Sequence, residues 1–351
     1  QEVWAEEDYY EAEDEDGVTE TIPQGVPAVV LWPSWWEMLN LAKQFEKFKE
    51  SQATLDPVGI NSRVLLVDAT NSYIRCFSAT PTMNDDGEHI GGTVGFLKSI
   101  ALYARNYKPT RIVMVFDGAG GSQRRRKLFE NYKNNRHSMR RLNRTYGFQS
   151  IEDEKESMKY QMRVLIEVLD QLPVNIFAVE NIEADDTIAY LSGLVTQVGG
   201  HSTIFSTDRD FIQLVSETWA VYNPVKKKVY DVPAVLEEYG IHPNNFLLYR
   251  IVNGDASDNI DGVKGIAIKS LLKMFPQLAN ETEMSIEELH TIASTLTSAA
   301  AKKLCEAHAE GVLERNHQLM NLKTVDIAGT TKLNILDMFN RGPNSYDKYT
   351  L

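Results

Sequence analysis

Acidic side chains follow four apolar segments of the sequence, at the point where each segment ends. These acids are Asp68, Asp117, Glu183 with Asp185 and Asp186, and Asp208 with Asp210. A further pair, Asp255 and Asp258, lies in the polar segment 253–259. A single aspartate after a strand is more often a helix cap or a turn residue than a ligand. Capping explains four such repeats poorly, so we predict that the acids form one shared site.

The chemistry of that site follows from its charge. Nine carboxylates in one place would repel one another and resist ionisation unless divalent cations supplied positive charge. A ligand set made only of oxygen suits Mg²⁺ or Mn²⁺ rather than zinc. The two cysteines, Cys76 and Cys305, lack Cys-x-x-Cys spacing, and none of the seven histidines lies beside a strand-end acid. The sequence therefore predicts a divalent-metal site without thiolate or histidine chemistry.

A basic block follows Asp117 closely in the sequence. Residues 124–144 contain nine basic side chains and the single acid Glu130. The basic residues are Arg124, Arg125, Arg126, Lys127, Lys133, Arg136, Arg140, Arg141 and Arg144. A solvated helix face is the alternative, but Phe129 and Tyr132 lie among these cations. Cations that displace counterions, together with aromatic rings that stack on bases, favour a nucleic-acid-binding element.

A glycine-rich turn follows the last acids. Its residues Gly262, Val263, Lys264 and Gly265 precede an expected helix. Backbone amides at such a turn can hold a phosphate without reading the base sequence. By itself the Gly-x-x-Gly spacing indicates only a turn.

The elements that must position these residues alternate between strand and helix. Apolar runs predict strands at 63–67, 111–116, 174–179 and 203–205, and helical spacing predicts helices at 93–107, 155–171 and 184–197. This order predicts an α/β fold with a central, mostly parallel sheet flanked by helices. The carboxyl ends of parallel strands meet at one edge, where such folds build their sites. Later segments are expected to be helical, at 233–239, 244–252, 266–274, 285–308 and 311–321.

The net charge of −13 is unevenly distributed along the 351 residues. Residues 1–20 hold ten acids and no lysine or arginine, so the other residues carry a net charge of only −3. We expect an acidic disordered leader at 1–33, an amphipathic helix and linker at 34–61, an α/β domain at 62–231 with a basic segment at 122–145, and a helical region at 232–351. Helical spacing of apolar residues in segment 34–48 indicates docking on the protein's own core or on a partner.

The motifs resemble one known family. Leu66-Val67-Asp68, Val115-Phe116-Asp117-Gly118, Glu183-Ala184-Asp185-Asp186, Ser206-Thr207-Asp208-Arg209-Asp210 and Gly254-Asp255-Ala256-Ser257-Asp258-Asn259-Ile260 are similar to motifs of the 5′ nucleases of the flap endonuclease superfamily. Their order and approximate spacing are closest to the phage 5′-3′ exonucleases that include phage ribonuclease H. The resemblance covers about residues 62–275.

The resemblance implies two Mg²⁺ ions, which Mn²⁺ can replace. It places one ion mainly at Asp68, Asp117, Glu183 and Asp185. It places the second near Asp186, Asp208, Asp210, Asp255 and Asp258, partly through water. It also implies a PIN-like nuclease core, a helical arch that admits a single-stranded 5′ end, and a helix-three-turn-helix element that grips duplex DNA.

Within this frame Lys133 and Arg136 are expected to contact the scissile phosphate. The other expected nucleic-acid-binding residues are Arg124, Arg125, Arg126, Lys127, Tyr132, Arg140, Arg141, Arg144, Gly262, Lys264 and Gly265. A K⁺ ion is often bound at the family's helix-three-turn-helix. Here Ala267 stands where a third glycine is frequent, which puts that ion in doubt.

The implied activity is hydrolysis of phosphodiester bonds at 5′ flaps, at single-stranded 5′ ends or in RNA–DNA hybrids, giving 5′-phosphate products in replication or repair. A PIN-type single-strand ribonuclease and a non-catalytic nucleic-acid-binding scaffold are the alternatives. The former does not need the glycine turn, and the intact acids argue against the latter. We further expect a monomer without membrane association, in a reducing cytoplasm near the nucleoid, of phage type in a bacterial host. A replisome protein is the expected partner of residues 34–48.

Overall fold

The computed structural model describes residues 9–13, 19–23, 59–136, 142–325 and 327–343. The expected helix at 34–48 lies outside these residues, as do Arg140 and Arg141. Two described strands, β1 (Tyr9–Glu13) and β2 (Thr19–Pro23), pair antiparallel within the leader. The expectation of a wholly disordered leader is therefore wrong for these ten residues. Aromatic and β-branched residues between the acids favour the strands, and the acidic composition had hidden this signal.

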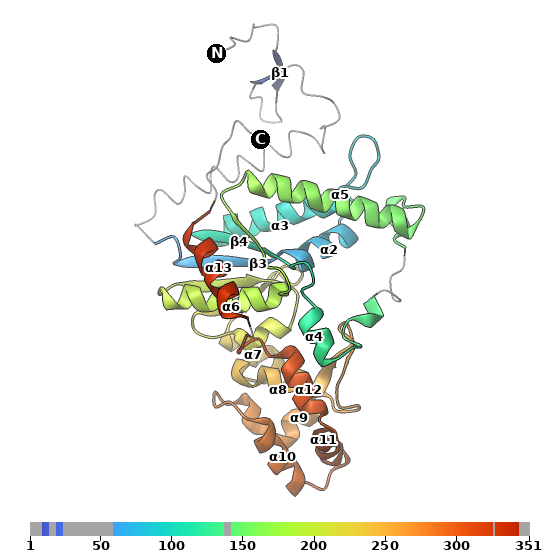
Figure 1. The fold of residues 1–351 in the computed structure, drawn as a ribbon, viewed down its shortest axis with the longest axis vertical. Coiled ribbons are helices and arrows are strands. Elements are labelled where there is room, and N and C mark those ends of the chain that lie inside the picture. Colours follow the sequence, from blue (N-terminus) through green and yellow to red (C-terminus); the bar gives the residue numbers. More distant parts are fainter. Residues whose placement is uncertain (1–8, 14–18, 24–58, 137–141, 326, 344–351) are drawn as a thin grey trace.

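A six-stranded sheet forms the centre of the fold, with strand order β5-β4-β3-β6-β7-β8 (Figure 1). Its strands are β3 (Arg63–Asp68), β4 (Arg111–Phe116), β5 (Asn175–Ala178), β6 (His201–Phe205), β7 (Trp219–Asn223) and β8 (Lys228–Tyr230). The first five are parallel and β8 is antiparallel to β7. The mostly parallel sheet predicted from the sequence is confirmed. Sequence patterning missed β7 and β8, because these short, partly buried strands carry little continuous apolar signal.

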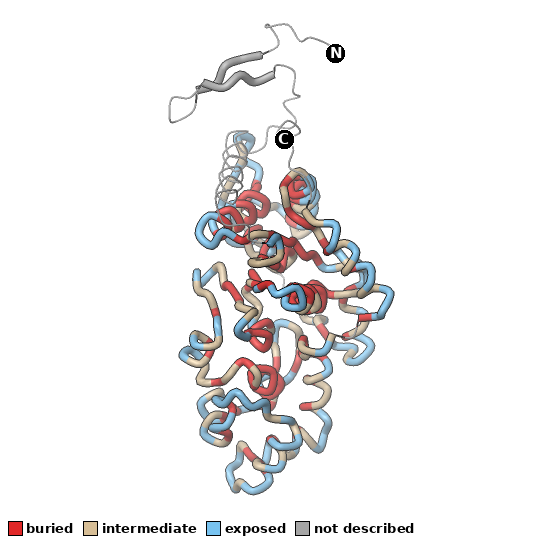
Figure 2. The backbone as a smooth tube through the Cα atoms, turned by 90° about the vertical axis from the view of Figure 1, so that its left-hand side faces the viewer, coloured by how far each residue is buried: buried red, intermediate tan, exposed pale blue. Residues whose placement is uncertain are grey.

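Alternate residues of the central strands supply two cores, one on each face of the sheet. Val64 and Leu66 of β3 pack into one core, and Leu65 and Val67 pack into the other. This alternation is the period of two that a strand imposes on its side chains. Buried segments run through the interior of the protein, and the exposed segments surround them (Figure 2).

Helices cover both faces of the sheet. The helices α2 (Ala69–Ala79), α3 (Gly91–Tyr107) and α5 (Ile151–Asp170) pack on one face, and α6 (Ala184–Gln197) packs on the other (Figure 1). Short elements lie between β4 and α5, namely α4 (Gln123–Leu128), η3 (Asn134–Arg136) and η4 (Arg144–Tyr146). Sequence patterning did not predict α2. Ser150 and Asp153 form a capping box that starts α5 four residues before the expected helix.

The region after β8 is helical apart from one small hairpin. It contains α7 (Val232–Tyr239), α8 (Pro243–Asn253), α9 (Ile268–Met274), η6 (Pro276–Ala279), α10 (Ile286–Thr295), α11 (Ala299–Ala309), α12 (Val312–Met320) and α13 (Gly329–Asn340). The hairpin pairs β9 (Gly254–Asp255) with β10 (Ile260–Asp261). One helix was expected over 285–308, but the structure has two. Ser298 accepts a hydrogen bond from Ala301 N and so starts α11 as a separate helix.

The last helix returns to the α/β part of the fold. Arg111 of β4 donates a hydrogen bond to Phe339 O of α13 at 2.6 Å. The guanidinium of Arg111 also lies 4.2 Å from the centre of the Phe339 ring. One continuous core joins the underside of the sheet to the helices beyond residue 231. The expected division at 231 therefore crosses a shared core, and α13 belongs spatially with α6.

None of the helices in the described segments is long and apolar enough to cross a membrane.

Candidate metal and nucleic-acid site

Three neighbouring strands bring their terminal acids to one edge of the sheet. Asp68 is the last residue of β3, and Asp117 follows β4 directly. Beyond β6, Ser206 donates a hydrogen bond to Asp68 Oδ2 at 2.8 Å and accepts one from Asp208 N at 3.0 Å. Ser206 therefore holds Asp68 and Asp208 side by side, as the parallel strand order predicted.

Helix α6 adds its N-terminus to this edge. Asp117 Oδ1 accepts a hydrogen bond from Ala184 N at 2.9 Å, so Asp117 caps α6 from a different strand. Asp68 in turn caps α2 by accepting from Asn71 N at 3.3 Å. Asp68 and Asp117 are therefore both helix caps, as the capping interpretation holds. Because each caps a helix that starts at this edge of the sheet, capping also places the two carboxylates at the same edge.

Four carboxylates at this edge, which we call the open cluster, are Asp68, Asp117, Asp185 and Asp208. In the described part of the chain, no lysine or arginine forms an ion pair with any of them. Burial, with nearby Asp117 and Asp208, raises the pKa of Asp68 to about 7 despite the Ser206 hydrogen bond. Burial and like charges also raise the pKa of Asp185 and that of Asp208. The open cluster therefore has no direct cationic partner in the described residues, although Lys133 lowers the pKa of Asp185 and Arg250 lowers that of Asp208 from nearby.

A second set of acids is neutralised by Arg125. Its guanidinium bonds to both oxygens of Asp186, at 2.7 and 2.9 Å, and also pairs with Glu183. All three side chains are buried. Adjacent residues on a helix point about 100° apart, so Asp185 faces the open cluster while Asp186 faces Arg125. Two expectations are corrected here: Asp186 is a partner of Arg125 rather than a free metal ligand, and Arg125 is not on a nucleic-acid-binding surface.

Arg250 neutralises the third set. Fully buried in α8, it pairs with Asp210 and with Asp255. Burial would raise the pKa of Asp255, but Ser257 and Arg250 hold it below its usual value. Burial and Asp208 raise the pKa of Asp210 to about 7 in spite of Arg250. Sequence reasoning missed Arg250, although a lone arginine in the apolar run Phe246–Val252 indicates a buried ion pair.

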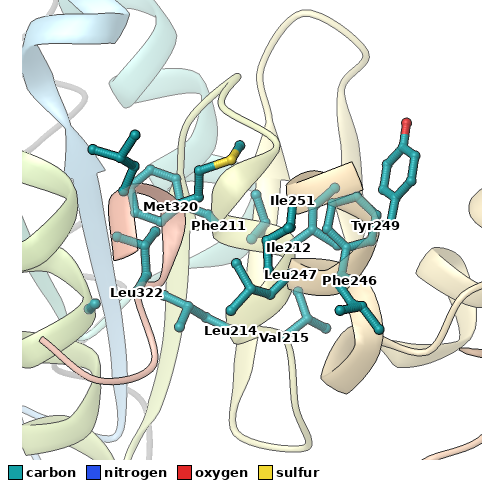
Figure 3. Close-up of a cluster of buried hydrophobic side chains, with 14 of the residues drawn as sticks. Phe211, Ile212, Leu214, Val215, Phe246, Leu247, Tyr249, Ile251, Met320 and Leu322 are labelled. Carbon is teal, nitrogen blue, oxygen red and sulfur yellow. The ribbon is translucent and has the colours of Figure 1, made fainter. Parts of the chain in front are cut away.

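Apolar packing places Arg250 beside Asp210. The short helix η5 (Asp210–Leu214) follows β6, and its Phe211 and Ile212 lie against the Phe246, Leu247 and Ile251 side of α8 (Figure 3). Met320 of α12 and Leu322 complete the same cluster (Figure 3). Because η5 starts at Asp210, its packing on α8 sets the distance between the carboxylate and the guanidinium.

Lys133 reaches the acids from the basic block. Its Nζ lies 2.5 Å from Glu183 Oε1 and 3.9 Å from Asp258 Oδ2. Burial would lower the pKa of Lys133, but Glu183 and Asp258 raise it, so the ammonium stays charged. The Tyr132 hydroxyl lies 3.2 Å from Glu183 Oε2 and 3.1 Å from Asp258 Oδ2. Tyr132 is 2% exposed, which corrects the expectation that it stacks on a base.

The outer face of α4 carries the exposed part of the basic block. Arg126 and Lys127 are exposed, and the half-buried Arg124 lies 3.7 Å from Asp186. A cavity of about 360 Å³ opens next to them, between the turn at 117–123, Arg126, Lys133 and Glu183. For Arg136 and Arg144, the structure places the backbone in η3 and η4. Their expected contacts with nucleic acid stay predictions.

The glycine turn lies between the β9–β10 hairpin and α9. A Cβ at Gly262 would come within 2.3 Å of Asn253 O, so close backbone packing requires glycine there. Gly265 has a φ of +84° and is exposed, as is Lys264. Lys303 of α11 donates to Lys264 O at 3.1 Å, which adds a cation that sequence reasoning missed. The turn is formed as expected, and its binding of phosphate stays a prediction.

The donor set fits hard divalent cations. The open cluster offers only carboxylate oxygens, and burial together with nearby negative charges raises the pKa of Asp68, Asp185 and Asp208. As the described side chains stand, no group of three or more His, Cys, Asp and Glu has the geometry to hold a metal ion. We therefore expect carboxylate rotation on metal binding.

Replacing Arg125 should destabilise the protein strongly. In Arg125→Met, Glu183 and Asp186 lose the cation that both share, and Asp186 keeps only the distant Arg124. Breaking a buried ion pair on one side costs about 3 to 5 kcal/mol. We expect a loss of this size in the free energy of unfolding, measured by urea denaturation at pH 7. The exposed neighbour Arg126→Met is the control, and equal stability of both variants would contradict the buried pairing.

Comparisons with known proteins agree with this fold. The family described as 5′-3′ exonuclease, N-terminal resolvase-like domain, matches residues 63–240. A 5′-3′ exonuclease from Buchnera aphidicola subsp. Schizaphis graminum is 31% identical over 222 residues, which cover 62% of this chain and 72% of the relative.

Two solved structures share the fold. A bacteriophage T5 5′-exonuclease with divalent zinc ions bound is 19% identical, with a TM-score of 0.64, and the match covers 79% of this chain and 98% of the other. A bacteriophage T5 flap endonuclease variant in a pseudo-enzyme-product complex with DNA and metal ions is 19% identical, with a TM-score of 0.63, covering 79% and 99%.

The fold and the relatives define a nuclease, a hydrolase of phosphodiester bonds. The chain belongs to the 5′-3′ exonuclease family, whose match spans residues 63–240 and includes the whole open cluster.

Proposed function

We propose that this nuclease is structure-specific and cleaves DNA near a 5′ flap or a single-stranded 5′ end, with two Mg²⁺ ions in its site. The observation that carries the proposal is the open cluster beside the Lys133 ammonium and the exposed cations of α4. A crowded group of acids without a direct cationic partner favours divalent metals, and the neighbouring cations favour a polyanionic substrate. RNA primers in RNA–DNA hybrids are a further proposed substrate.

The metal ligands we propose are the four carboxylates of the open cluster for one ion, with Asp208 and Asp258 nearest to the second. Glu183, Asp210 and Asp255 already have cationic partners and would support these ligands from behind. When bound, divalent ions supply countercharge to the scissile phosphate and acidify the attacking water. A K⁺ ion at the glycine turn has no supporting observation here.

The protein's own residues supply the rest of the mechanism. Lys133, held 2.5 Å from Glu183, is placed to donate to a phosphate oxygen when substrate enters the cavity beside it. Charge develops on that oxygen in the transition state, so a fixed ammonium there stabilises the transition state more than the ground state. The backbone phosphates on either side would bind the exposed Arg126 and Lys127 and, farther along the duplex, the turn at 262–265.

Cleavage of labelled substrates tests this function. A 5′-labelled flap should be cut near the junction, and cutting should require added Mg²⁺ or Mn²⁺ and stop with a chelator. Blunt duplex DNA and single-stranded RNA are tested in parallel as comparison substrates. Preferential cutting of single-stranded RNA would support the PIN-type ribonuclease instead, and metal-independent binding without cutting would support the scaffold.

Stability without metal should fall as the pH rises. Folding raises the pKa of Asp68 to about 7, so the folded state binds this proton more tightly than the unfolded chain. The stability gained is present below the unfolded pKa and is lost as the pH rises through about 7. In chelator, we expect the urea midpoint to decrease from pH 5 to pH 8.

The variant Asp68→Asn removes this charge. Its one amide oxygen can still accept from Asn71 N, and its amide NH2 group can donate to a reoriented Ser206 hydroxyl. At pH 8 in chelator it should be more stable than the natural sequence, on the order of 2 kcal/mol. If the stability of the natural sequence does not depend on pH, or if Asp68→Asn is no more stable at pH 8, the crowding of acids in the open cluster is contradicted.

A further inference from the structure

Two loops that are far apart in the sequence, 131–135 and 255–259, are joined by hydrogen bonds beside Lys133. We call these hydrogen bonds the fastening. Asn135 Nδ2 donates a hydrogen bond to Ala256 O at 2.7 Å, and Asn259 Nδ2 donates one to Asn131 O at 2.8 Å. Between these two bonds, Lys133 N donates to Asp258 O at 2.9 Å. Each loop therefore supplies one asparagine amide that binds a backbone carbonyl of the other.

The backbone at the centre of this arrangement is strained. Lys133 has a φ of 59° and Asn259 a φ of 60°, in the left-handed region. Asparagine tolerates this region better than most residues, whereas lysine rarely adopts it. Surrounding structure must hold such a conformation, and strained residues of this kind cluster at functional sites. The two asparagine bonds flank the strained lysine on both sides.

The strain determines where the Lys133 side chain points. In its observed conformation the ammonium reaches Glu183 and Asp258, and Lys133 and Glu183 both line the cavity of about 360 Å³. A relaxed backbone at Lys133 would redirect the Cα–Cβ bond and move the ammonium off the carboxylates. The loop at 255–259 also continues into the glycine turn at 262–265, so the fastening joins two segments proposed to bind nucleic acid.

We propose that Asn135 and Asn259 are positioning residues that fasten loop 131–135 to loop 255–259 and thereby fix the Lys133 ammonium at the open cluster. The inference rests on the proposed role of Lys133 in cleavage. Neither asparagine touches the reacting atoms; both act through the backbone of Lys133. A shift of about 1 Å in such a group is enough to lower a rate by about 100-fold.

The first test measures the fastening without measuring activity. Backbone hydrogen–deuterium exchange is followed for segment 131–135 in the natural sequence, in Asn135→Ala and in Asn259→Gly. Glycine at 259 relieves the left-handed backbone but removes the amide donor. We expect both variants to exchange the Lys133 amide at least tenfold faster, with the same melting temperature within 3 °C. Unchanged exchange in both variants would overturn the proposal, whether or not the protein cleaves DNA.

The second test asks whether the asparagines act through Lys133. Single-turnover cleavage of a 5′-labelled flap should slow about 10- to 100-fold in Asn135→Ala, with a dissociation constant within twofold of the natural value. In a Lys133→Ala background, Asn135→Ala should cause no further loss. A multiplicative loss in the double variant, or a natural rate in the single variant, would overturn the positioning role.

A neighbouring asparagine provides the matched control. Asn134 Nδ2 bonds only within its own loop, to Glu130 O at 3.2 Å and Asn131 Oδ1 at 3.4 Å. Asn134→Ala should retain the natural exchange rate at Lys133 and the natural cleavage rate. If Asn134→Ala changes the exchange and cleavage rates as much as Asn135→Ala does, the effect comes from a general loosening of loop 131–135, and the proposed fastening is wrong. If the natural sequence itself does not cleave, the proposed function fails while the exchange result still decides the fastening.

Discussion

Asp208→Asn should abolish cleavage, with a loss of about 1,000-fold or more in the single-turnover rate, while binding of flap DNA stays nearly unchanged. Asp208 is the member of the open cluster that faces both Asp68 and Asp258, so its charge contributes to both proposed metal positions. Metal ions in such a site supply several kcal/mol of transition-state stabilisation. The DNA-binding cations lie on other elements and are not altered.

The substitution is conservative in structure. Asp208 Oδ1 accepts a hydrogen bond from Asp210 N at 2.8 Å, and the amide oxygen of asparagine can keep it. Rates are measured with enzyme in excess over a 5′-labelled flap, and affinities by fluorescence anisotropy in Ca²⁺. The exposed Asp86→Asn is the control and should cleave normally. Near-natural turnover in Asp208→Asn would contradict the assignment of the open cluster as the metal site.

Lys133→Ala should lower the single-turnover rate by about 100- to 1,000-fold, which is the typical effect of removing one donor that stabilises transition-state charge. The dissociation constant for flap DNA should change little, because the exposed cations of α4 remain. Glu183 keeps its ion pair with Arg125, so the variant should fold.

Comparing the single-turnover rate with the dissociation constant distinguishes a role of Lys133 in transition-state stabilisation from a role in DNA docking. Lys159→Ala, on the exposed surface of α5, is the matched control and should leave both quantities unchanged. If Lys133→Ala raises the dissociation constant and leaves the single-turnover rate at saturating enzyme unchanged, the residue is a docking contact only.

Much of the fold could be predicted because its signals are local. Buried parallel strands such as β3 and β4 are continuous apolar runs, and their terminal acids mark the carboxyl edge of the sheet. The short strands β7 and β8 lack such a signal, because pairing with β6 and with each other decides them. The break before α11 depends on one cap residue, Ser298, which the helical spacing of apolar residues does not reveal. Helix α13 was missed because its position depends on Arg111, which lies 228 residues away in the sequence from Phe339.

For the site, the sequence could predict which residues gather but not how their charges pair. It predicted nine acids around the metal ions and a basic block, residues 124–144, outside them. The structure instead places Arg125 and Lys133 of the basic block among the acids, together with Arg250 from the apolar helix α8. Pairing depends on which face of α4, α6 and α8 each side chain occupies, and that is set by packing across elements. The result is a smaller set of acids left for metal.

The most direct measurement of the central claim is the position of Mn²⁺ in crystals of the natural sequence, located by anomalous diffraction. We expect at least one ion bound among Asp68, Asp117, Asp185 and Asp208, with the ion pairs of Arg125 and Arg250 intact. The same crystals of Asp208→Asn should show reduced occupancy there. Mn²⁺ bound between Glu183 and Asp186 with Arg125 displaced, or no Mn²⁺ at the open cluster at millimolar concentration, would contradict the account.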